Sequence, residues 1–140
     1  MSKVTAIGVE VEFKNGVPKL SDCTVTYTGG VVWRGALDEK FDPKDEGTVL
    51  YSTGDVYEGE VESNKRNGFG TFTSADGVSY AGEWLDDKCT GFGEAFFGDK
   101  WFYSGNWENN SCSGQGVLNA GDYRYRGEWK DGQKNGFGSL

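Results

Sequence analysis

The chain has 140 residues, of which 23 are glycine, 5 tryptophan, 7 tyrosine and 9 phenylalanine, and its net charge is −8. The absence of histidine excludes histidine triads and histidine metal sites, the acidic charge argues against a nucleic-acid-binding surface, and no apolar run reaches the roughly 18 residues of a membrane-spanning helix. Good helix formers are few, with 6 Ala, 6 Leu and 1 Met, so a helical bundle is disfavoured.

Residues 9–53 contain two degenerate copies of a motif that is clear further along the chain. The segment from Trp33 to Leu37 keeps the motif's spacing of aromatic, glycine and apolar residues, and the segment from Phe13 to Gly16 keeps only its end. An acidic insertion, residues 38–46, interrupts the second copy. It lacks the alternating aspartates and central glycine of a calcium loop, so we expect no metal there.

Residues 54–140 contain four clear copies of the motif. Each opens with tyrosine, then glycine two residues later, and then tryptophan or valine. A second element, Gly-x-Gly, follows eleven residues after the tyrosine in each copy. The four opening tyrosines are Tyr57, Tyr80, Tyr103 and Tyr125, at steps of 23, 23 and 22 residues. Such a fixed period indicates a repeat architecture in which each copy is one supersecondary unit.

Each copy is predicted to form two short antiparallel strands. In the first element the tyrosine, glycine and tryptophan are two residues apart, so they share one face of a strand. Turn residues such as Asp131 and Gly132 join the two elements. About six hairpins in succession predict an all-β fold over residues 1–140, namely an elongated, twisted, single antiparallel meander of stacked hairpins.

Aromatic rings and glycines alternate across neighbouring strands of this meander. A ring on one strand can lie flat across a glycine on the next, because no Cβ displaces it. The resulting seam is either the core of the sheet or a partly open binding groove. In the second interpretation it binds a partner, through Tyr57, Tyr80, Tyr103, Tyr125, Trp84, Trp107 and Trp129.

The motif resembles the MORN repeat (membrane occupation and recognition nexus), most closely in the fourteen residues from Tyr125 to Gly138. Leu37 and Val61 replace the tryptophan, and Gln115 replaces the aromatic residue between the glycines. The resemblance implies a solenoid-like sheet without catalytic residues that binds partner segments or pairs with itself. It also implies two alternatives: a phospholipid-associating module, or a regulatory module at the N-terminus of an enzyme such as a lysine methyltransferase or a phosphatidylinositol phosphate kinase.

We therefore expect a non-catalytic scaffold or adaptor that binds a helical or extended protein segment through its aromatic face and open edges. A homodimer through the terminal unit is a further expectation, and no cofactor is expected. Lipid is disfavoured because the basic residues occur only in pairs on an acidic chain. Glu60 could pair with Glu58 on its own strand or with Glu83 in the next copy. The same glutamate recurs at Glu128, however, whereas a unique active site does not repeat itself. A cytoplasmic location is expected, with association to the cytoskeleton or a membrane as a further option.

Cys89 and Cys112 occupy equivalent positions 23 residues apart. Two strand spacings separate such positions by about 9–10 Å, which exceeds the limit of about 7 Å for a disulfide. All three cysteines are therefore predicted to be free thiols.

Overall fold

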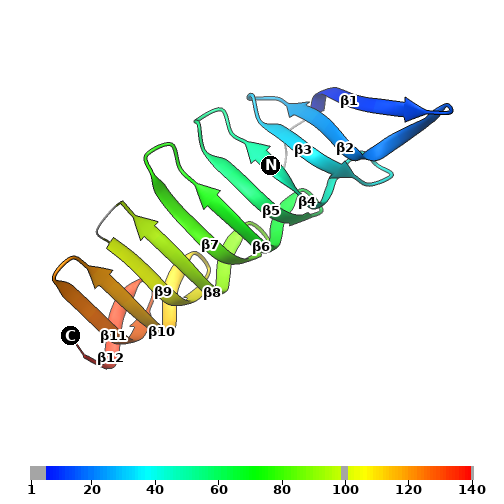
Figure 1. The fold of residues 1–140 in the computed structure, drawn as a ribbon. Helices are drawn as coiled ribbons and strands as arrows, with labels where there is room; N and C mark the ends of the chain where they lie inside the picture. The colour runs from blue at the N-terminus through cyan, green and yellow to red at the C-terminus, as the bar shows by residue number, and fades with distance from the viewer. Residues whose placement is uncertain (1–5, 99–100, 140) are drawn as a thin grey trace.

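The computed structural model describes residues 6–98 and 101–139, which form one sheet in which every strand pairs with the next in sequence (Figure 1). All pairs are antiparallel. The strands are β1 (Ala6–Lys14), β2 (Val17–Tyr27), β3 (Val32–Leu37), β4 (Pro43–Leu50), β5 (Val56–Glu62), β6 (Lys65–Thr73), β7 (Val78–Leu85), β8 (Lys88–Phe97), β9 (Trp101–Glu108), β10 (Ser111–Ala120), β11 (Tyr123–Lys130) and β12 (Gln133–Ser139). The predicted fold class, a single open meander of hairpins, is confirmed.

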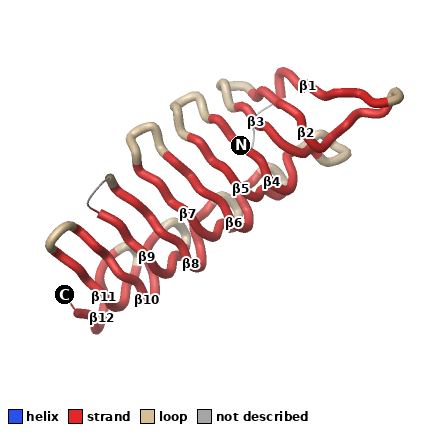
Figure 2. Tube along the Cα trace, viewed as in Figure 1, coloured by secondary structure: helices blue, strands red, loops and turns tan. Residues whose placement is uncertain are grey.

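Each hairpin from β3–β4 to β11–β12 contains a bulge beside its central pair of glycines. In β5–β6, for example, Gly59 pairs with Gly70 and Val61 pairs with Arg66, so the second strand carries two extra residues. The pairs that join one hairpin to the next, such as β6–β7, have no register shift. A bulge bends a strand and increases its twist. Each of these five hairpins therefore bends at the same position, and the bends line up along the sheet (Figure 2).

The hairpin turns of the four clear repeats place two residues each in the left-handed region, which matches type I′ turns and the twist of the sheet. Asparagine and aspartate tolerate this conformation better than other residues with a Cβ. Six of the eight left-handed turn residues in the four clear repeats are asparagine or aspartate. The eight residues are Ser63 and Asn64, Asp86 and Asp87, Asn109 and Asn110, and Asp131 and Gly132.

The degenerate N-terminal copies also form hairpins. They supply β1–β2 and β3–β4, which extend the same sheet. The acidic insertion is only partly a loop, because β4 begins at Pro43, inside it. Asp38 shapes what remains of the loop, since its carboxylate accepts hydrogen bonds from the amides of Lys40 and Asp42 at 2.8 and 3.0 Å.

Candidate functional site

The seven aromatic residues predicted to bind a partner form one continuous ladder of rings. Each tyrosine meets a tryptophan edge to face, with ring centroids 5.1 to 5.5 Å apart and interplanar angles of 83° to 89°. Such pairs contribute about 0.5–1.5 kcal/mol each beyond the burial of the rings. The order along the ladder is Tyr57, Trp84, Tyr80, Trp107, Tyr103, Trp129 and Tyr125.

Glycines make room for the tyrosine rings, as predicted. A Cβ on Gly70, Gly93 or Gly116 would overlap the ring of a tyrosine on the preceding strand. The same geometry supplies hydrogen bonds, since the Tyr103 hydroxyl donates to the Asn106 carbonyl at 2.9 Å. Trp107 Nε1 donates to the Gly93 carbonyl at 3.1 Å. Equivalent bonds recur in the other clear repeats, so the polar ends of the rings are satisfied inside the protein.

Burial leaves little of the ladder accessible. Six of its seven residues are no more than 8% exposed, and Trp107 is half-buried. The ladder is therefore the core of the sheet, which was the first of the two interpretations of the aromatic seam. A direct role of these seven side chains in partner binding stays a prediction, and a partner on this face would mainly touch their neighbours.

The buried tyrosines make the fold sensitive to alkali. Burial raises the pKa of Tyr57, Tyr80 and Tyr103 above the usual 10.0, and it raises the pKa of Tyr27 to about 12, with a smaller contribution from Asp42. The folded state therefore holds protons that the unfolded chain releases near pH 10. We expect the free energy of unfolding to be unaffected by these groups below about pH 9. Above pH 10 it should fall by about 1.4 kcal/mol per pH unit for each such tyrosine.

Denaturant titrations at about pH 8, 9, 10.5 and 11 measure this effect. A Tyr103→Phe variant is the control, because it removes one titrating group and should reduce the slope above pH 10. A free energy of unfolding that is constant from pH 8 to pH 11 would contradict the assignment.

The cation Arg66 packs over a ring in the N-terminal part of the ladder. The Arg66 guanidinium lies 4.5 Å from the ring centroid of Trp84, and its Nε lies 3.0 Å from Oδ1 of Asp87. The Asp87 carboxylate also accepts the Arg66 amide at 2.8 Å, so a turn in one repeat fixes a strand in the preceding one. Asn110 repeats this role by accepting the amide of Cys89 at 2.7 Å.

A row of exposed apolar residues continues the ladder's face toward the loops between repeats. Val78 pairs with Phe97 in register, and Trp101 follows on the next strand. Val78 and Trp101 lie two residues before Tyr80 and Tyr103, so they share a face with the ladder. Their exposed fractions are 39% for Val78, 46% for Phe97 and 52% for Trp101. We call these three residues the rim patch and the side of the sheet that carries the ladder the aromatic face.

The repeat motif did not predict the rim patch. Its signal was present, because the alternation that places Tyr80 and Tyr103 on the aromatic face extends two residues further back to Val78 and Trp101. The motif ends at the tyrosine, however, and these positions vary between copies, with Asp55 and Tyr123 in the first and last clear repeats. Only the structure shows that apolar residues at the loop ends of three adjacent strands remain exposed.

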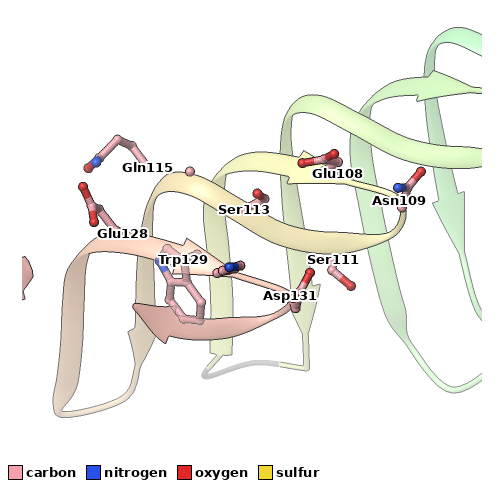
Figure 3. Close-up of a pocket in the computed structure, with 10 residues that line it drawn as sticks. Glu108, Asn109, Ser111, Ser113, Gln115, Glu128, Trp129 and Asp131 are labelled. Atoms are coloured by element: carbon pink, nitrogen blue, oxygen red, sulfur yellow. The ribbon is translucent and has the colours of Figure 1, made fainter. Parts of the chain in front are cut away.

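Open polar hollows lie between successive hairpin ends beside the bulge glycines. One hollow has a volume of about 670 Å³, and its lining includes Glu108, Glu128, Trp129 and Asp131 (Figure 3). An equivalent hollow of about 620 Å³ lies two repeats earlier, with Glu62, Gly68 and Trp84 in its lining. Within the residues that the structure describes, no three carboxylate or thiol groups converge in a way that could hold a metal ion.

The recurring glutamates have a structural role. Glu83 accepts the backbone amide of Phe92 at 2.7 Å, and Glu60 accepts the amide of Phe69 in the preceding repeat. Both bonds span the bulge of a hairpin, where the regular pairing is interrupted. The periodic carboxylates thus satisfy amides that the bulges expose.

The three cysteines, Cys23, Cys89 and Cys112, are free, which confirms the prediction from strand spacing. Burial raises the pKa of Cys89 and of Cys112 to about 11. Burial therefore disfavours the thiolate, the nucleophilic form, at neutral pH.

A family model described as MORN repeat matches the chain over residues 57–79, 80–100, 103–122 and 125–140. The four matches coincide with the four clear repeats and together cover more than half of the sequence. No curated protein sequence matches the chain. Across the described residues, no helix is long and apolar enough to cross a bilayer.

Proposed function

The chain belongs to the MORN-repeat family, and we propose that it is a non-catalytic scaffold that binds a helical segment of a protein partner on its aromatic face. The observation that carries this proposal is the exposed rim patch beside the buried ladder. Apolar side chains grouped on an otherwise acidic surface are a common mark of an interaction site. The ladder would hold the patch in position rather than contact the partner.

The spacing of the rim patch fits a helix that crosses the strands. Val78, Phe97 and Trp101 lie on β7, β8 and β9, and neighbouring strands are about 4.8 Å apart. Apolar residues at i, i+3 or i+4, and i+7 of a helix are about 5 Å apart along its axis. One face of an amphipathic helix could therefore place an apolar side chain at each of three strands, which is the helix-in-groove mode of recognition.

A library of displayed helical peptides, selected on the wild-type protein, tests this proposal. We expect enriched peptides to carry apolar residues at i, i+3 or i+4, and i+7. Substitution of Phe97→Ser together with Trp101→Ser should weaken their binding at least about tenfold, since central aromatic residues dominate interface energies. Fluorescence anisotropy with a labelled peptide measures the change.

Phe13→Ser is the matched control, because Phe13 is 69% exposed but lies on β1, away from the rim patch. Its variant should bind the peptides as the wild type does. Equal binding to the double variant would refute the proposal. Flotation with anionic vesicles that the double variant abolishes would instead favour the lipid alternative, against which the net charge of −8 argues.

A further inference from the structure

The sheet face opposite the ladder, which we call the outer face, has an unequal distribution of charge. The register defines a middle row of outer residues on consecutive strands from β5 to β11. In strand order they are Glu58, Thr71, Ala81, Glu94, Ser104, Val117 and Arg126. The side chains of this row are therefore acidic on β5 and β8 and basic on β11. The side chains on the strands between them are short and uncharged.

Aromatic residues lie near the centre of the same face. Phe96 on β8 and Phe102 on β9 are register partners, and their rings stack with centroids 5.4 Å apart and an interplanar angle of 14°. Phe96 is 42% exposed, so the stacked pair projects from a surface of short side chains. In the same row on β11, Arg124 adds a second positive charge.

Among the residues that the structure describes, the arginines at the basic end of the outer face have no ion-pair partner. The one ion pair among the described residues joins Arg66 and Asp87. Arg124 and Arg126 are exposed, as is Glu58 at the other end of the middle row. Opposite charges at the two ends of one surface, with an aromatic pair between them, make that surface complementary to a second copy of itself.

A two-fold axis parallel to the strands, between β8 and β9, brings these features together. It places β8 of one copy over β9 of the other, β7 over β10 and β6 over β11. Phe96 then faces Phe102 of the second copy, and Ala81 faces Val117. Arg126 faces Thr71, whose register neighbour is Glu58. An axis perpendicular to the strands would instead place each strand over itself, so that Glu58 would approach Glu58.

A hollow in the outer face fits the same arrangement. Its volume is about 440 Å³, and its lining includes Ser104, Asn106, Gln115 and Val117. Phe92, which is 54% exposed, pairs with Asn106 in the register. The axis between β8 and β9 therefore places Phe92 of the second copy over Asn106, at the hollow.

We propose that the outer face forms a symmetric homodimer, with Phe96 and Phe102 at the two-fold axis and Arg126 of each copy beside Glu58 of the other. This contact is distinct from the end-to-end pairing expected from the open sheet edges, and it leaves the rim patch free. The six mutually facing strands, β6 to β11, with about five residues along each, give a face on the order of 500 Å² per copy. That is small for a stable interface, so the dissociation constant is expected in the micromolar range.

Sedimentation equilibrium at about 5 to 200 µM protein and low salt tests the proposal, because this range brackets a micromolar dissociation constant. We expect a monomer–dimer equilibrium. Glu58→Arg and Arg126→Glu should each weaken dimerisation at least about tenfold, since each places like charges across the contact twice. Both side chains are exposed, so circular dichroism should show unchanged folding.

Mixing the two variants supplies the matched control. A heterodimer of Glu58→Arg with Arg126→Glu restores opposite charges at both contacts, so the mixture should dimerise like the wild type. A monomeric wild type, variants that dimerise normally, or a mixture that stays monomeric would each overturn the proposal. Pairing through the edge strands β1 and β12 would appear as dimerisation that neither substitution affects.

Discussion

Replacing Gly116 by alanine should destabilise the protein by about 3 kcal/mol, near the upper end of the cost of overpacking a core. The added Cβ would overlap the ring of Tyr103, which is 1% exposed and lies between Trp107 and Trp129. Gly116 does not adopt a positive φ, so the backbone accepts alanine and the cost is steric. Urea denaturation followed by tryptophan fluorescence measures the loss.

Gly8→Ala is the control for this substitution. Gly8 also lies in a strand without positive φ, but nothing lies within 4 Å of the position that its Cβ would take. We expect its stability to change by no more than about 0.5 kcal/mol, as for most surface substitutions. If both alanine variants were equally stable, the contact between ring and glycine would not be a determinant of this fold.

Replacing Tyr103 by alanine should cost about 3–5 kcal/mol, which is typical for deletion of a large buried aromatic side chain. The change removes two edge-to-face contacts and the hydrogen bond to the Asn106 carbonyl. Tyr103 belongs with Tyr125 and Trp129 to the C-terminal of two core clusters. Because repeats are stabilised mainly by their neighbours, we expect the last two hairpins to unfold before the rest, as a separate transition.

Two further variants separate the causes of that loss. Tyr103→Phe keeps the ring and should cost only about 1 kcal/mol, the usual contribution of one hydrogen bond. Phe13→Ala removes an exposed ring and should leave stability unchanged within about 0.5 kcal/mol. A single cooperative transition in Tyr103→Ala, with stability equal to that of Tyr103→Phe, would show that the ladder does not couple the repeats.

The ladder could be predicted in large part because its determinants are local. The two-residue spacing of Tyr80, Gly82 and Trp84 places them on one face of a strand in any sheet. The 23-residue step then brings equivalent residues into register on neighbouring hairpins. The overlap of the Tyr80 ring with a Cβ at Gly93 confirms the predicted contact between ring and glycine.

The accessible surface could not be predicted in this way. The seven ladder residues and the rim patch share one face and similar chemistry, yet Tyr103 is 1% exposed and Trp101 is 52% exposed. The difference arises from the bulges beside the central glycines, which curl each hairpin around the ladder and leave the loop ends uncovered. A bulge depends on how two strands pair, and the spacing of residues within one strand does not specify it.

The sequence alone therefore determined the repeat, the period, the antiparallel meander and the contact of rings with glycines, because these follow from side-chain alternation within a strand and from the fixed step between copies. The tertiary structure decided which aromatic residues are core and which are surface, and which charges of the described residues face outward. Those properties depend on the curvature of the whole sheet and on neighbours from other repeats, and both exist only once the hairpins have stacked.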